Sequence, residues 1–188
     1  MSEDSNVVPL PGTYWVVPNE LLAGSYPGHS DREAMDVRLQ SLLDSGIRSV
    51  INLVAEEEVL EHENGELFAP YEDRLEELGE ARGELIEIQR HAIEVSQTPT
   101  PAEMEIILDA IDAEIDGRNS PTFVHCSDGH GRTGTVIGCY LARHEIAVGK
   151  DALARISELR SGDPELSAHK SPANIVQERL VTRWKPEQ

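Results

Sequence analysis

The sequence has few cysteines, few aromatic residues and no long apolar run, and each shortage excludes a class of protein. Two cysteines, Cys126 and Cys139, cannot form the disulfide framework of a small secreted domain. No run of about 18 apolar residues is present, so we expect no membrane-spanning helix. The first residues are acidic and polar, without the basic start and apolar stretch of a signal peptide. We therefore expect a cytoplasmic protein.

Positive charge is also scarce. The chain has 16 basic residues, of which only Lys150, Lys170 and Lys185 are lysines, against 35 acidic residues. The formal net charge is −19 at pH 7. Such a chain repels other polyanions, so we expect neither a nucleic acid nor an anionic membrane surface as its partner.

What the sequence contains is an alternation of strand and helix patterns over 188 residues, a length that is enough for one core. Strands are predicted at residues 14–17, 21–24, 47–54, 84–89 and 122–124. Helices are predicted at residues 31–43, 56–62, 71–82, 100–115, from 133 onward, 151–160 and 172–183. This alternation predicts an α/β fold, with a single layered domain, a central, mostly parallel sheet and helices on both faces. We expect residues 1–12 to be disordered and residues 13–188 to form the domain.

The sequence predicts the N-terminus of one helix in detail. Thr100 is a capping residue, Pro101 suits the first helical position, and Glu103 completes a capping box. The helix that opens there would place Met104, Ile107, Leu108, Ile111 and Ile115 on one buried face.

The most informative segment reads Val-His-Cys-Ser-Asp-Gly-His-Gly-Arg-Thr-Gly and covers residues 124–134. It joins a short buried strand to an apolar helix, so the N–H groups of the loop should point inward, toward the start of the helix. Such a loop binds a dianion without a metal or another cofactor, and we expect neither here. Glycines permit the unusual backbone angles of a tight loop. The predicted phosphate-binding residues are Ser127, Asp128, Gly129, His130, Gly131 and Arg132.

Cys126 and Arg132 carry the chemistry that we predict for this loop. A free thiol has a pKa of about 8.5, which a helix N-terminus or a cation lowers to roughly 3.5–7.5. A Cys126 thiolate below a bound phosphate would attack in line and form a phosphocysteine. The planar fork of Arg132 suits two phosphate oxygens at once. Thr133 could donate its hydroxyl to the departing sulfur, and His125 would orient the loop through hydrogen bonds.

This segment resembles the signature of the cysteine-dependent protein tyrosine phosphatases, which is His-Cys, five residues of any type, and Arg followed by Ser or Thr. Here it reads His125-Cys126 and Arg132-Thr133, followed by Gly134. Residues 21–28, 42–53 and 171–184 resemble segments of small bacterial phosphatases of the dual-specificity type. The resemblance implies the fold of that superfamily and hydrolysis of phosphotyrosine, with phosphoserine and phosphothreonine as further substrates. The implied partner is a phosphorylated protein or a small phosphomonoester.

The general acid is where the sequence departs from this pattern. The family places an aspartate about thirty residues before the cysteine, where it protonates the leaving group. An ungapped match puts Val95 at that position, and Glu94 lies beside it. The alternatives that we retain are Glu94, Asp128, a cationic His91 or His130, and no general acid at all.

Two other functions remain open from the sequence. One is an inositol phosphate or phosphoinositide phosphatase, and the other is a pseudophosphatase that binds phosphorylated partners without turnover. Among the remaining residues, we interpret the run Glu56-Glu57-Glu58 as a solvated helix start and Cys139 as a core residue. Asn174 and Gln177 lie where family members often have polar residues near the loop.

Overall fold

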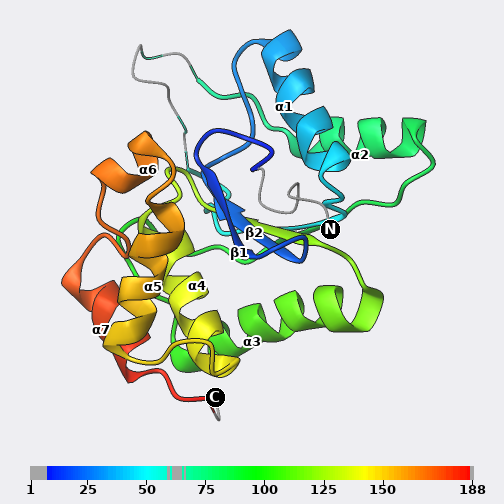
Figure 1. Ribbon diagram of the computed structural model, residues 1–188. Coiled ribbons are helices and arrows are strands. Elements are labelled where there is room, and N and C mark those ends of the chain that lie inside the picture. The colour runs from blue at the N-terminus through cyan, green and yellow to red at the C-terminus, as the bar shows by residue number, and fades with distance from the viewer. Residues whose placement is uncertain (1–7, 59, 61–64, 66, 187–188) are drawn as a thin grey trace.

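The computed structural model describes residues 8–58, 60, 65 and 67–186, which fold into a five-stranded sheet with helices on both faces (Figure 1). No helix within these residues is long and apolar enough to cross a bilayer. The elements in chain order are β1 (Thr13–Val17), β2 (Leu21–Gly24), α1 (Arg32–Asp44), β3 (Ser49–Asn52), α2 (Glu72–Ala81), β4 (Glu87–Arg90), α3 (Pro101–Asp112), β5 (Thr122–His125), α4 (Gly131–Arg143), α5 (Lys150–Arg160), α6 (Pro164–Ala168) and α7 (Ile175–Arg183). A short π-helix, Ala113–Gly117, continues α3.

The sheet has the order β1-β2-β5-β3-β4. Only the β1–β2 pair is antiparallel, so the prediction of a mostly parallel sheet is confirmed. β5 lies in the middle, between β2 and β3, and both neighbours run parallel to it. The segment that follows β5 therefore leaves the sheet at the carboxyl ends of its central strands, where ligand sites of open α/β sheets lie.

Two hydrophobic cores cover the two faces of the sheet. Side chains of a strand point alternately to opposite faces. Phe123 accordingly packs with residues of α1 and α2, whereas Val124 packs with residues of α3, α4 and α5. In Figure 1, α1 and α2 lie on one side of the strands and α3, α4, α5 and α7 on the other.

The predicted capping box is present at the start of α3. The backbone N–H of Glu103 donates to the Thr100 hydroxyl at 3.3 Å, and the Glu103 carboxylate accepts from the Thr100 N–H at 2.7 Å. The predicted apolar face is buried as well, from Met104 to Ile111. Ile115 is partly buried and lies in the π-helix.

Some predicted elements differ from the structure. Residues 56–58 form a turn instead of the start of a helix, and most of the remainder of that predicted helix lies outside the described residues. The strand predicted at residues 84–89 is β4, which begins three residues later than predicted and ends one residue later. The last helix begins only at Ile175, because the Asn174 side chain accepts from the N–H groups of Val176 and Gln177 and so caps it. α6 was not predicted.

The expected disorder of residues 1–12 does not extend to residues 8–12. Leu10 is buried, and the N–H of Gly12 donates to the Asp163 carboxylate at 2.8 Å. Asp163 precedes α6 and also caps it by accepting from the N–H of Leu166. Packing of the chain therefore begins before residue 13, because a residue far along the sequence anchors this segment. Residues 1–7 lie outside the described residues.

The contact between α4 and α7 yields a test of the packing. A Cβ at Gly138 would lie 2.5 Å from Cγ1 of Val181, whereas a Cβ at Gly117 would meet nothing within 4 Å. We expect Gly138→Ala to lower the free energy of unfolding by about 1–3 kcal/mol relative to Gly117→Ala, through overpacking. Urea unfolding of both variants measures this difference. Equal stability of the two variants would show that α7 is not seated against Gly138.

Candidate active site

Residues 126–131, which follow β5 and end with the first residue of α4, are called the Cys loop below. Three of its carbonyls are turned away from the loop centre. That of Cys126 accepts from the His125 ring at 3.1 Å, that of Ser127 from the backbone N–H of Tyr26 at 2.9 Å, and that of His130 from the Ser171 hydroxyl at 2.7 Å. In a trans peptide group the C=O and the N–H point in opposite directions, so the N–H groups of the residues that follow these three carbonyls point toward the loop centre.

The N–H groups of the Cys loop are therefore available to a ligand. Among the described residues, the N–H groups of residues 127–132 donate no hydrogen bond. The first turn of α4 begins at Gly131, without a side-chain cap. Free N–H groups at a helix N-terminus form an anion site. The sequence predicted that the N–H groups of this loop point inward, and the hydrogen bonds of its carbonyls agree with that direction.

The two glycines of the Cys loop are needed for different reasons. Gly129 has φ +70°, and a Cβ there would lie 2.7 Å from backbone atoms of Gly24 and Ser25. Gly131 does not have a positive φ, so the prediction of an unusual angle is wrong at this position. A Cβ at Gly131 would instead lie 3.0 Å from the Gln177 side chain. Gly131 thus permits a close approach of α7.

His125 and Cys126 point to opposite sides of the sheet, as successive residues should. Cys126 is 2% exposed, in the core beside α4. The His125 ring is fully buried, and its Nδ1 donates to the Cys126 carbonyl, which can only accept. Its Nε2 therefore accepts from the Tyr71 hydroxyl at 2.6 Å. Burial lowers the pKa of His125 to about 3, so the ring is neutral and suited to orienting the loop.

Arg132 is 4% exposed and nearly saturated with hydrogen bonds. Nη1 donates to Glu58 Oε2 at 2.5 Å and to the Ile93 carbonyl at 3.1 Å. Nη2 donates to Glu58 Oε1 at 2.8 Å and to the Ser127 hydroxyl at 2.8 Å. Only Nε is without a hydrogen-bond partner among the described residues. The edge formed by Nε and Nη2 is thus the side on which two oxygens of an anion could bind, in place of the Ser127 hydroxyl.

Glu58 is a site residue that the sequence reasoning missed. The interpretation as a solvated glutamate is wrong, because its side chain is only 12% exposed and pairs with both Nη atoms of Arg132. Burial acts to raise the pKa of Glu58, but the hydrogen bonds and charge of Arg132 outweigh it and hold the pKa below its usual range. Glu56 and Glu57 beside it are exposed. No local pattern could distinguish Glu58 from these two neighbours.

Two other predicted residues, Asp128 within the Cys loop and Thr133 just after it, have side chains with other surroundings. Thr133 is buried, and its hydroxyl donates to the Gly24 carbonyl at 3.3 Å, so it is directed toward the end of β2. Asp128 is exposed at the surface of the loop. Its charge nonetheless reaches the Arg132 guanidinium, whose pKa it helps to raise against the effect of burial. A role of Thr133 toward the sulfur would require its side chain to rotate.

Residues 92–97 are called the acid loop below, and they are tied to the site at both ends. The Ile93 carbonyl accepts from Arg132, which places the backbone of Glu94 next to the guanidinium. At the other end, the Asn174 side chain donates to the Ser96 carbonyl at 3.0 Å, and that of Gln177 donates to the Gln97 carbonyl at 3.2 Å. The side chains of Glu94 and Val95 are exposed.

The two candidate histidines are poorly suited to donate a proton. Burial lowers the pKa of His91. Burial, followed by the charges of Arg160 and His169, lowers the pKa of His130 to about 4. Nδ1 of His130 also accepts from Arg160 at 2.5 Å, so this nitrogen carries no proton. Both rings are neutral at pH 7.

Comparison with known proteins gives a match over most of the chain. The family model PTP-SAK, described as a Swiss Army Knife protein with a DSP-PTPase phosphatase domain, matches residues 11–173. Two curated proteins of Arabidopsis thaliana are also similar. Inositol diphosphatase DSP5 is 29% identical over 138 residues, which is 72% of this chain and 56% of that protein. Inositol diphosphatase DSP3 is 44% identical over 41 residues, which is 22% of this chain and 20% of that protein. The chain thus spans about half or less of these relatives.

Solved structures show the same fold. The crystal structure of Tk-PTP in the active form matches with a TM-score of 0.67 and 18% sequence identity. The match covers 95% of this chain and 98% of Tk-PTP. The predicted fold of the protein tyrosine phosphatase superfamily is therefore confirmed.

The ion pair between Glu58 and Arg132 leads to a test. We expect Glu58→Gln to lower kcat/KM for an aryl phosphate by about tenfold, because a charge-assisted hydrogen bond that orients Arg132 is lost. Steady-state kinetics measure this effect, and Glu57→Gln, an exposed neighbour, is the matched control that should stay at the parent value. A higher kcat/KM in Glu58→Gln would instead identify Glu58 as a competitor of the substrate.

Proposed function

We propose that this chain, which belongs to the PTP-SAK family of DSP-PTPase phosphatase domains, hydrolyses phosphomonoesters through a phosphocysteine on Cys126. The observation that carries this proposal is the Cys loop. In it, Cys126 is followed by a set of N–H groups that donate no hydrogen bond within the described residues, and Arg132 has an unpartnered Nε beside an Nη2 that donates to Ser127. A phosphate bound there would meet a nucleophile below it and positive charge around it, as acyl- and phosphoryl-transfer sites require.

In the first step, the Cys126 thiolate attacks phosphorus, the S–P bond forms, and the bond from phosphorus to the ester oxygen breaks. The three equatorial oxygens would be held by the N–H groups of the Cys loop and by the Nε/Nη2 edge of Arg132. The leaving oxygen takes up a proton. We assign that proton to the Glu94 carboxyl, because the backbone of Glu94 is held next to Arg132 by the Ile93 carbonyl.

In the second step, water attacks the phosphocysteine. The P–O bond forms, the S–P bond breaks, and the electron pair returns to sulfur as the thiolate. Glu94, now ionised, would accept the proton of the attacking water. Inorganic phosphate then leaves, and the starting state of both residues is restored.

As substrate we propose phosphotyrosine in proteins, with phosphoserine and phosphothreonine as slower substrates. Val95 and Ile175 are 57% and 56% exposed, on two segments that the hydrogen bond from Asn174 to Ser96 holds together beside the Cys loop. An apolar rim of this kind suits an aromatic ring. Arg132 is the only cation of residues 126–133, because the His130 ring is neutral, and this favours a substrate with a single phosphate.

A second candidate, an inositol phosphate or pyrophosphate, is favoured by the similarity to two proteins named inositol diphosphatases. Turnover of an aryl phosphate in the presence of a chelator, followed by kcat/KM for phosphopeptides and for inositol polyphosphates, separates the two. A higher kcat/KM for the inositol compounds would reverse the proposed order. A chain that binds vanadate but turns over none of them would be a pseudophosphatase.

The nucleophile is tested by Cys126→Ser. We expect this variant to lose turnover and to keep its affinity for inorganic phosphate, because the Cys loop backbone and Arg132 stay in place. Cys139→Ala, which changes the other buried thiol, should retain turnover. Activity assays with a matching phosphate titration measure both properties. Residual turnover by Cys126→Ser near the parent rate would exclude a phosphocysteine.

The general acid is tested by Glu94→Gln. Loss of general acid catalysis costs about 10²–10⁴-fold, and the cost is greatest for poor leaving groups. We therefore expect this variant to lose far more kcat on an alkyl phosphate than on nitrophenyl phosphate. Glu105→Gln, an exposed glutamate on α3, is the control. An equal loss on both substrates, or none, would remove Glu94 from this role.

A further inference from the structure

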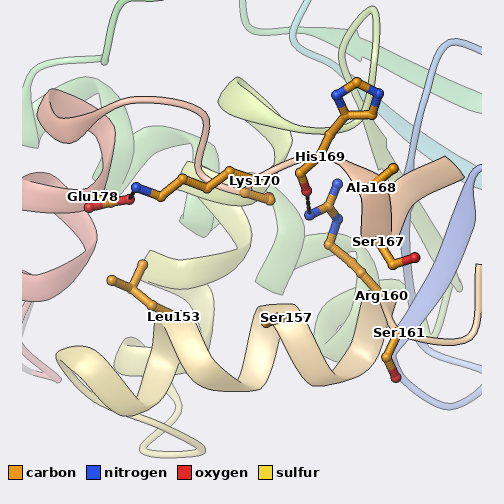
Figure 2. Close-up of a pocket in the computed structure, with 10 residues that line it drawn as sticks. Leu153, Ser157, Arg160, Ser161, Ser167, Ala168, His169, Lys170 and Glu178 are labelled. Carbon is orange, nitrogen blue, oxygen red and sulfur yellow. Dashed lines mark hydrogen bonds and ion pairs between the residues drawn. The ribbon is translucent and has the colours of Figure 1, made fainter. Parts of the chain in front are cut away.

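Arg160, the last residue of α5, is a buried cation that lies outside the signature segment. It is 3% exposed. Its Nη2 donates to Nδ1 of His130 in the Cys loop at 2.5 Å, and its Nη1 donates to the His169 carbonyl at 2.9 Å. Figure 2 shows the side chain rising from α5 toward His169. Arg160 is thus hydrogen-bonded directly to the loop that we propose binds phosphate.

Arg160 lacks an ion-pair partner within the part of the chain that the structure describes. Both groups that accept its hydrogen bonds are neutral, and Nε has no partner. The nearby Asp163 carboxylate is engaged by the N–H groups of Gly12 and Leu166. An unpaired buried charge is costly, so a protein that retains one has a use for it or supplies a counter-charge.

The groups that face Arg160 come from several elements. Burial lowers its pKa, while Tyr14 on β1, Asp163 and Cys126 in the Cys loop would act in the opposite direction when ionised. The Tyr14 hydroxyl is buried and has no hydrogen-bond partner among the residues that the structure describes, and burial raises its pKa, so Tyr14 stays neutral. Besides Asp163, the group among these that could bring a negative charge to Arg160 is therefore Cys126, once its thiol is ionised.

His130 is the point at which Arg160 acts on the loop. Its ring accepts from Arg160 and stacks on the His169 ring, with 4.7 Å between the centroids. Its carbonyl accepts from the Ser171 hydroxyl. These three contacts fix the residue that directly precedes Gly131 and Arg132. The orientation of the Arg132 backbone and of the N–H groups beside it thus depends on a frame built by α5 and by residues 169–171.

We propose that Arg160 is a positioning residue for catalysis, which holds the Cys loop through His130 and keeps a second buried positive charge against that loop. This inference rests on the proposed function, since it assigns Arg160 to the same reaction. Arg132 faces the bound phosphate from one side of the loop, and Arg160 supports the loop from the α5 side. A shorter cation at position 160 would keep the charge and lose the bidentate grip on His130 and His169.

A cavity beside Arg160 provides space in which a lysine at position 160 could be hydrated. It has a volume of about 400 Å³ and lies between α5, residues 167–171 and α7 (Figure 2). Its lining includes Ser157 of α5, Ser161 directly after α5, and Lys170, which pairs with Glu178. Water can enter this space, so a lysine at position 160 would be hydrated.

The test compares Arg160→Lys and Arg160→Met with Arg155→Met, a control on the same helix whose side chain is 39% exposed. Four quantities are measured: kcat and KM on an aryl phosphate, the inhibition constant of inorganic phosphate, the rate of Cys126 alkylation by iodoacetamide, and the urea midpoint. For Arg160→Met we expect slower alkylation and weaker phosphate inhibition, each by about tenfold, because charge and orientation are both lost. Arg160→Lys should restore alkylation while kcat stays low. Arg155→Met should match the parent.

Specific results would overturn the proposal. Arg160→Met that folds and keeps the parent alkylation rate and phosphate inhibition shows that Arg160 has no role at the site. A fall in the urea midpoint without a change in those two quantities shows a structural role only. If Arg160→Met does not fold, parent alkylation and kcat in Arg160→Lys give the same negative answer. Alkylation and phosphate binding by the parent do not need turnover, so failure of the proposed function is recognised separately.

Discussion

The direction of the peptide groups in residues 126–131 is the constraint on which the rest of the site depends. Their carbonyls are held outward by three donors from three places: the His125 ring, the N–H of Tyr26 and the Ser171 hydroxyl. The N–H groups are consequently left for an anion, at the start of α4. The His125 ring is held in its turn by the Tyr71 hydroxyl. The anion site therefore comes from the packing of the whole domain around one loop.

The site gathers positive charge although the chain as a whole is strongly negative. With a net charge of −19, the surface repels anions at long range, and the attraction for phosphate must come from a few buried groups. Arg132 provides the fork and is held by Glu58, which uses both Nη atoms and leaves Nε free. Arg160 supports the same loop from α5 and pairs with no carboxylate in the described part of the chain. One arginine is oriented by an acidic partner, and the other is held by two neutral acceptors.

Several features could be predicted because their causes are local. The capping box depends on Thr100 and Glu103, which are three residues apart. Gly129 has the positive φ that a tight loop requires and that glycine adopts most easily. Other features could not. The predicted helix at residues 56–62 assumed that three successive glutamates are equivalent, whereas Glu58 turns inward to a guanidinium 74 residues away. Gly131 was predicted for its backbone angle, yet the approach of Gln177 from α7 is the reason for it.

The sequence by itself determined the type of fold, the Cys loop and the pair of Cys126 and Arg132, because these depend on periodicity and on spacing within one short segment. Only the tertiary structure decided which groups orient that pair. Glu58, Tyr71 and Arg160 come from separate segments of the chain, and they reach Arg132, His125 and His130, respectively. Such contacts leave no periodic pattern in the chain, since they depend on where the sheet and its helices bring distant residues together.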